Sequence, residues 1–395
     1  MDRFSTTLST LPPLDLHSIR ADSQRLRKAQ ACLDHLTSSG RWMHDAGVAD
    51  VTTLETNDAV WKWRVPEAGE CRLYDDLRTT EAARKLLAGH HIMIIGDLHA
   101  RLHYAALVFL LNGTATPDDV AFGFPQHKGS CWNPDSARRG GYGFGGWDHI
   151  PKRSPCHLRW YGSNAGTLHN LTMTHPPGSK AWWGRGTSRD VMTLLLRDKV
   201  ISTTYRSPPP VAASGIEGAI VTYVWKGVVR TSGSYKQQHA RHLAQVAAKV
   251  GTPPTMILAA MGTYDSQWQT VGEVSGRLSG LFEGFALRWP ASEPRAPLLV
   301  FSGSSSCASG KKYSVYMGKE TRHNHFHNMP NASSLIPYAR QAATNRSVLY
   351  IDTNGVQLTV PPLRSSPCHY DLPIGVMSEA LVQITLGALA SSVRG

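Results

Sequence analysis

The sequence has no long hydrophobic run. Although 41% of its 395 residues are hydrophobic, no stretch approaches the roughly eighteen consecutive apolar residues that a membrane-spanning helix needs. The N-terminal segment 1–20 also lacks an apolar stretch followed by a cleavage site, which a signal peptide would have. We therefore expect a soluble chain with no membrane span and no recognisable export signal.

Cysteine pairs at metal-binding spacing are absent as well. The six cysteines lie far apart and form no Cys-x-x-Cys pair, which argues against a zinc site of the usual kind. They are Cys32, Cys71, Cys131, Cys156, Cys307 and Cys368. A Cys32–Cys71 disulfide would fit a compact N-terminal region, but whether any bridge forms depends on the compartment.

Four Asn-x-Ser/Thr sequences favour the secretory pathway, because such sequences are acceptors for N-glycosylation. They begin at Asn112, Asn170, Asn331 and Asn345. This indication conflicts with the missing export signal, so the residues alone leave the compartment open.

Acidic residues are too few to balance the basic ones. The chain has 41 Lys and Arg against 29 Asp and Glu, a formal net charge of +12. The excess is spread along the chain, with contributions from the Arg-rich ranges 138–153 and 184–206, and no run of five or six basic residues occurs. Spread positive charge favours an acidic partner, such as a polyanionic polysaccharide, a nucleic acid or an anionic assembly. The alternative is a basic protein without such a partner.

The segment 92–111 combines two structural patterns. Residues 92–95 are apolar and run through Gly96 into Asp97, and from about Ala100 the apolar residues take helical spacing. The helical positions are Tyr104, Leu107, Val108, Leu110 and Leu111. The pattern predicts a buried strand, a tight glycine turn and an amphipathic helix. Such a corner lies at the carboxyl edge of a parallel sheet, where α/β proteins usually place their chemistry.

Most of the remaining chain alternates predicted strands and helices. We expect strands over 219–225, 255–261, 296–301 and 347–352. We expect helices over 21–36, 80–88, 235–250, 268–288, 333–343 and 374–390. This alternation predicts an α/β fold with a parallel sheet covered by helices on both faces.

Composition divides the chain into three predicted parts. Residues 1–20 are rich in Ser, Thr and Pro and are expected to form a flexible arm. Residues 21–75 hold three tryptophans and two cysteines and are interpreted as a compact subdomain. Residues 76–395 form the main domain, with an insertion rich in Gly, Trp and Arg at about 112–190. That insertion is either a surface for a ligand or partner, or a set of loops that its tryptophans pin to the protein.

One hypothesis for the corner is a metallophosphoesterase. Residues 96–99 read Gly-Asp-Leu-His, which resembles the Asp-x-His that opens the dinuclear metal site of that family. Such a site needs a second Asp, an Asn-His pair and further histidines at later strand ends. The chain has no Gly-Asp-x-x-Asp and no Gly-Asn-His, and its His-rich segment 322–328 fits a solvated polar loop equally well. This hypothesis is the minor alternative.

A second set of residues, spaced over about 32–390, supports a different relationship. In chain order they are Cys32, Gly40, Trp42, Trp61, Trp63, Pro66, Cys71, Asp75, Leu86, Leu87, Gly89, Ile94, Ile95, Gly96, Asp97, Arg101, Tyr104, Leu107, Leu110 and Leu111, then the blocks 221–225 and 262–268, and finally His369, Tyr370, Leu372 and Pro373. Together they resemble the PC-esterase superfamily, which includes trichome-birefringence-like polysaccharide O-acetyltransferases and sialate O-acetyltransferase domains. The resemblance implies an SGNH (GDSL-like) three-layer α/β/α sandwich, acyl-ester chemistry on carbohydrate, and a place in the secretory pathway or Golgi lumen.

The resemblance also implies a catalytic triad that this chain has largely lost. In the family, a Gly-Asp-Ser turn presents the nucleophile and a late Asp-x-x-His supplies the acid and the base. Here Leu98 stands at the Ser position and Ser366 at the Asp position, so only His369 is retained. An alkyl side chain cannot attack an acyl carbon, and serine cannot stabilise an imidazolium by charge. The third block, 260–263, has no Asn to donate to an oxyanion.

Other residues near the implied cleft have lesser roles in this interpretation. Asp97 and Arg101 would hold the turn, and His99 and His103 would be a polar lining or surface histidines rather than a new base. The remaining turn and cleft positions are Gly96, Gly262, Thr263 and Asp265. The substitute nucleophiles Ser304, Ser305, Ser306 and Cys368 would need an arrangement that the family does not use.

These observations favour a PC-esterase-like pseudoenzyme that binds a glycan or a macromolecular partner and uses no cofactor or metal. The alternative is an active O-acetyl esterase or acetyltransferase acting on carbohydrate. The two hypotheses differ in whether a nucleophile lies near His369.

Overall fold

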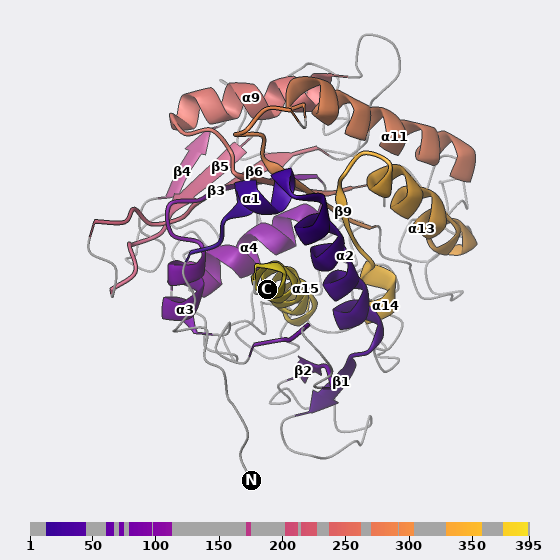
Figure 1. The fold of residues 1–395 in the computed structure, drawn as a ribbon, viewed down its shortest axis with the longest axis horizontal. Coiled ribbons are helices and arrows are strands. Elements are labelled where there is room, and N and C mark those ends of the chain that lie inside the picture. The colour runs from indigo at the N-terminus through magenta and orange to yellow at the C-terminus, as the bar shows by residue number, and fades with distance from the viewer. Residues whose placement is uncertain are drawn as a thin grey trace, which may run out of the picture.

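The computed structural model describes a mixed α/β structure built on one seven-stranded sheet (Figure 1). The described residues are 13–44, 61–66, 71–74, 79–96, 98–112, 171–174, 202–211, 215–226, 237–261, 270–290, 292–303, 329–357 and 374–393. Across the sheet, the strands are β4 (Leu171–Thr174), β5 (Ser202–Arg206), β6 (Ile220–Trp225), β3 (His91–Gly96), β7 (Met256–Ala260), β8 (Leu298–Ser302) and β9 (Leu349–Ile351).

Five of these strands, β6, β3, β7, β8 and β9, run parallel to one another. Numbered along the chain, they lie in the order 2-1-3-4-5, which is one of the two common doubly wound orders. Every residue of β3, β7, β8 and β9 is buried. Their mainly apolar sequences are typical of parallel strands covered on both faces.

The sheet is not wholly parallel, because β4 and β5 add an antiparallel edge. The strand β5, Ser-Thr-Thr-Tyr-Arg, is mostly polar and was not among the predicted strands. β4 lies within the predicted insertion and is the part of it that the structure describes.

Helices cover both faces of the sheet, and alternate residues of each strand point to opposite sides. Ile92 and Ile94 join one core, and Met93 and Ile95 join the other. The first core includes α1 (Leu16–Ala21), α2 (Ser23–Ser38), α3 (Thr80–Leu86), α4 (Leu98–Asn112), α14 (Thr353–Gln357) and α15 (Ile374–Ser392). The second includes α9 (Gln238–Val250), α11 (Val271–Arg288) and α13 (Met329–Thr344). The predicted α/β class with helices on both faces is therefore confirmed.

None of the helices in the described residues is long and apolar enough to cross a membrane.

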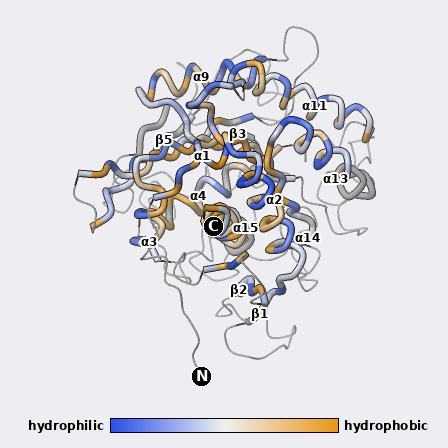
Figure 2. Tube along the Cα trace, viewed as in Figure 1, coloured by the Kyte–Doolittle hydropathy of each residue, from blue (hydrophilic) through white to orange (hydrophobic). Residues whose placement is uncertain are grey.

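The helix α15 lies in the middle of the first helical layer, with α2 and α4 beside it (Figure 1). Every residue from 380 to 392 is buried, and Figure 2 shows α15 as a mainly hydrophobic segment. Two of its hydroxyl groups bond within the helix, since Thr385 donates to the carbonyl of Leu381 and Ser392 donates to that of Leu389. A helix that is apolar on all sides needs such a central position.

The tryptophan-containing N-terminal strands pack into the same core as the sheet. β1 (Arg41–His44) and β2 (Trp61–Arg64) are antiparallel, and the rings of Trp42 and Trp63 meet edge to face with centroids 5.3 Å apart. Trp42 Nε1 donates to the carbonyl of Val356, and Trp63 Nε1 donates to that of Leu36. Each indole nitrogen therefore has an acceptor, as buried tryptophans usually require.

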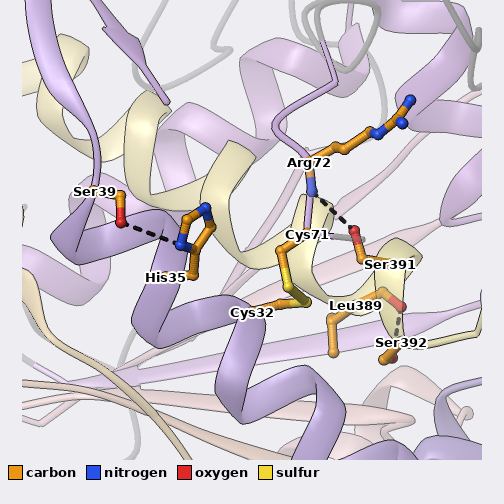
Figure 3. Close-up of a disulfide and its surroundings, with 8 residues drawn as sticks. All are labelled: Cys32, His35, Ser39, Cys71, Arg72, Leu389, Ser391 and Ser392. Carbon is orange, nitrogen blue, oxygen red and sulfur yellow. Dashed lines mark hydrogen bonds between the residues drawn. A yellow bond between two sulfur atoms is a disulfide. The ribbon is translucent and has the colours of Figure 1, made fainter. Parts of the chain in front are cut away.

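A disulfide joins Cys32 of α2 to Cys71, as the sequence suggested. Next to it, the backbone N–H of Arg72 donates to Ser391 Oγ near the end of α15 (Figure 3). Gly387 faces the carbonyl oxygen of Arg72, where a Cβ would come within 2.8 Å. The segment after Cys71 thus lies directly on α15 and is tied to α2.

The prediction of a flexible arm is wrong for residues 14–20. These residues include α1, whose Leu16 and Ile19 are fully buried and whose N-cap Asp15 accepts from the backbone N–H of Ser18. The backbone N–H of Leu14 also donates to the carbonyl of Leu86. A few well-placed apolar residues outweigh the Ser, Thr and Pro content here, because burying each side chain is favourable by about 1.5–3 kcal/mol.

A buried histidine stabilises the amino edge of the sheet. His91 hydrogen-bonds through Nδ1 to the carbonyl of Thr252 and through Nε2 to Thr222 Oγ1, which lies 3.1 Å from Thr204 Oγ1. Burial is the main cause that lowers the pKa of His91 to about 4. The network links β3, β6 and β5 in the neutral state of the imidazole.

The structure therefore predicts a loss of stability in mild acid. In the unfolded state the His91 imidazole has its ordinary pKa of 6.5 and is protonated below that pH. In the folded state it stays neutral until about pH 4. Stability consequently falls as pH drops from 6.5 toward 4, and this contribution is constant below that window. We expect the urea midpoint of the wild type to fall more steeply over this window than that of His91→Gln. An equally steep fall of the urea midpoint in both proteins would show that His91 does not cause this pH dependence.

Candidate functional site

The predicted corner lies at the topological switch point of the sheet. β3 is the first parallel strand, with the second strand, β6, on one side and the third, β7, on the other. In doubly wound folds, ligands bind outside the carboxyl ends of the strands at this point. β3 ends there with Gly96, and α4 begins at Leu98. The sequence-based prediction of a strand, a glycine turn and a helix is confirmed.

Gly96 is required by the close approach of β3 and β7. Its φ is +150°, and an added Cβ would fall inside the contact distance of the Ala260 carbonyl oxygen and 2.6 Å from its carbonyl carbon. The carbonyl oxygen of Gly96 accepts from the backbone N–H of Lys226 and from the hydroxyl of Tyr223. The turn is therefore fixed by both neighbouring strands.

Two histidines of α4 lie in the protein interior beside the corner. His99 and His103 are one helical turn apart and are 6% and 2% exposed, so the expectation that they could be surface histidines is wrong. His103 Nε2 lies 3.2 Å from Ser302 Oγ at the end of β8. Burial, with a smaller contribution from His99, lowers the pKa of His103 to about 3. His103 is therefore a neutral imidazole that links α4 to β8.

The His103–Ser302 pair has the residue types of a nucleophile and its base, but its surroundings do not suit catalysis. Ser302 is 1% exposed, so a substrate carbonyl cannot reach its hydroxyl without movement of the chain. An imidazole with a pKa near 3 is also a poor proton acceptor at neutral pH. Ser302 was not among the predicted site residues, because the predicted strand ended one residue before it.

A small cavity lies behind His103, between the sheet and the helices α4 and α15. Its volume is about 20 Å³, and its lining is apolar apart from His103 and Thr385. This volume is enough for about one water molecule. It is too small for a sugar or an acyl group.

A larger surface groove of about 360 Å³ lies at the opposite, amino edge of the sheet, where α9 ends and β7 begins. Its lining includes Gly251, Pro253, Arg288 and Trp289. None of the predicted site residues lies in this groove.

Several predicted site residues lie outside the described residues. They are Asp97, Gly262, Thr263, Asp265, Ser304, Ser305, Ser306, Ser366, Cys368 and His369. Leu98 and Arg101 are placed as backbone positions in the first turns of α4. Within the described residues, the structure thus brings together Gly96, His99, His103 and Ser302 at one edge of the sheet.

No group of three or more His, Cys, Asp or Glu that could hold a metal ion occurs in the part of the chain that the structure describes. Of the residues that a dinuclear site would use, Asp97 and the His-rich segment 322–328 lie outside that part, whereas His99 lies within it. The metallophosphoesterase hypothesis therefore stays a prediction.

Comparisons with known proteins leave the family of the chain open. No family model, curated protein or solved structure matches it.

Proposed function

We propose that the chain is a PC-esterase-like protein that has lost its catalytic nucleophile and binds an anionic glycan at the carboxyl edge of the sheet. The observation that carries this proposal is the place of Leu98. It is the first residue of α4, immediately after the Gly-Asp turn at the switch point. A nucleophilic esterase of this type needs a hydroxyl at that position.

The geometry of the fold supports the ancestry that the resemblance implies. The described residues form a doubly wound parallel sheet with helices on both faces, and β3 enters α4 through a glycine that no other residue can replace without strain. We also propose, as details of the same fold, that this sheet belongs to an SGNH-type sandwich and that the tryptophan-containing N-terminal region is a subdomain of it.

The described residues offer no substitute catalyst at the corner. His103 and Ser302 are the pair with suitable chemistry, and both are sealed in the interior. The corner has lost its nucleophile but has kept its glycine turn. This combination favours binding as the remaining role of the site.

The net charge of +12 supports an anionic ligand. Lysine and arginine attract sulfate, carboxylate and phosphate groups over several ångströms in water. A polysaccharide that carries such groups combines this charge with the carbohydrate ligands of the resembled family. A nucleic acid is the competing polyanion.

The loss of catalysis is tested with a serine-directed fluorophosphonate probe and an acetyl-ester hydrolysis assay. We expect neither labelling nor turnover for the wild type. Leu98→Ser alone should gain little, because Ser366 lacks the charge of the missing acid, whereas Leu98→Ser combined with Ser366→Asp should gain labelling and hydrolysis. Stoichiometric labelling of the wild type, with turnover that His369→Ala abolishes, would identify an active esterase instead.

The binding half of the proposal is tested on heparin and on a sulfopropyl resin of similar charge density. We expect later elution from heparin, with affinity that falls steeply as salt rises. Equal elution from both resins would show non-specific cation exchange and contradict glycan binding. Competition by DNA at lower concentration than by sulfated glycan would favour the nucleic acid.

A further inference from the structure

The helix α13 ends in a strained turn that carries one of the four glycosylation sequences. In the Schellman pattern, the backbone N–H of Val348 donates to the carbonyl of Ala343, and that of Ser347 donates to Thr344. Ser347 adopts the left-handed conformation that this motif requires, with a φ of 55°. It is the one residue other than glycine with a positive φ in the described part of the chain.

Serine is an unfavourable choice at this position. Left-handed backbone costs a residue with a Cβ about 1–2 kcal/mol, and helices commonly place glycine there. The helix α9 of the same protein follows this rule, because its left-handed C-cap is Gly251. The strain at Ser347 therefore needs an explanation.

No contact of the Ser347 hydroxyl within the described fold explains this strain. The side chain is exposed and makes no hydrogen bond to any described residue. The contact that ties this turn to the protein uses the backbone instead, since Arg20 Nη1 donates to the Ser347 carbonyl at 2.7 Å. Glycine would keep that contact and relieve the strain.

Glycine would, however, destroy the sequence Asn345-Arg346-Ser347, in which the hydroxyl residue is essential for N-glycosylation. Asn345 is exposed at the same turn. The Cys32–Cys71 disulfide is typical of an oxidising compartment, and N-glycans are added in the oxidising lumen of the secretory pathway. We propose that Asn345 is an N-glycosylation site and that Ser347 is retained, despite its strain, as the acceptor hydroxyl.

The modification is a transfer without oxidation or reduction. The Asn345 amide nitrogen forms a bond to C1 of an oligosaccharide carried on a lipid diphosphate, the bond between C1 and the diphosphate oxygen breaks, and the amide nitrogen loses one proton. The lipid diphosphate leaves. The product lies at the amino edge of the sheet, because the turn precedes β9. The glycan is therefore at the opposite edge from the corner at Gly96, so the proposal is independent of the proposed function.

The test uses the full chain, secreted from eukaryotic cells behind a cleavable signal peptide. Peptide N-glycosidase in heavy-oxygen water, followed by mass spectrometry, should mark Asn345 as Asp in the 341–346 peptide. Asn345→Gln and Ser347→Gly should each remove the mark, and Ser347→Thr should keep it.

Stability separates the role of the hydroxyl from a role in the fold. In unglycosylated protein, we expect Ser347→Gly to raise the melting temperature by about 1–2 °C for each kcal/mol of strain relieved, while Asn345→Gln leaves it unchanged. An unmodified Asn345 in the secreted, disulfide-bonded protein overturns the proposal. So does a Ser347→Gly protein that is less stable than the wild type, because the serine would then serve the fold.

Discussion

Replacing Gly96 with alanine is expected to reduce the free energy of unfolding by more than about 4 kcal/mol, a large part of the roughly 5–15 kcal/mol by which native domains are usually stable. The added Cβ would overlap the carbonyl group of Ala260 in β7, and both are backbone-constrained parts of the central sheet. The residue also has a φ of +150°, which alanine rarely adopts. Relief would require β3 and β7 to separate at the centre of the fold. Urea unfolding and the yield of soluble protein measure this effect.

Gly276 provides the matched control. It is an exposed glycine within α11, and a Cβ there would meet nothing within 4 Å. Gly276→Ala should therefore stabilise the protein by about 0.5–1 kcal/mol through helix propensity. A Gly96→Ala protein that unfolds at the same urea concentration as Gly276→Ala would show that the close approach of β3 and β7 is not required.

Removing the Cys32–Cys71 disulfide is expected to have the second largest effect. The bridge closes a loop with a sequence separation of 39 residues, for which the chain-entropy relation gives about 4 kcal/mol of stabilisation. The double replacement Cys32→Ala and Cys71→Ala should lower the free energy of unfolding by about this amount. Chemical unfolding under oxidising conditions measures the loss.

The covalent effect can be distinguished from the loss of buried side-chain volume. Cys32 is fully buried, so its replacement by alanine also removes packing around α2. Treating the wild type with a reductant breaks the bond and leaves both sulfur atoms in place. If the reduced wild type is as stable as the oxidised one, the disulfide does not stabilise the fold and the loss in the double variant comes from packing alone.

The strands of the parallel sheet could be predicted because their signal is local. The predicted strand 255–261 corresponds to β7, and 296–301 corresponds to β8 with a shift of two residues at its start. Strands buried on both faces are apolar along most of their length, so the sequence alone indicates them. The corner at Gly96 was predicted in the same way, from a change of periodicity across a glycine.

Contacts between distant residues could not be predicted in that way. His103 and Ser302 are 199 positions apart in sequence, and neither residue shows a pattern that indicates its partner. The same holds for Gly96. A glycine is expected at a turn, but the lack of space for a side chain at this position is caused by Ala260 in another strand. The antiparallel strand β5 was missed because its polar residues do not show the apolar alternation of a half-buried strand.

The central position of α15 has a consequence for biosynthesis. This helix follows every other described element in the chain, yet it fills the space between α2, α4 and the sheet. While the chain is being made, the apolar surfaces that later enclose α15 are exposed to solvent, and such surfaces favour aggregation. Cys32 and Cys71, in contrast, are both synthesised early. The disulfide can therefore form first and hold the segment at Arg72 against α2 as one wall of the space, which α15 enters last.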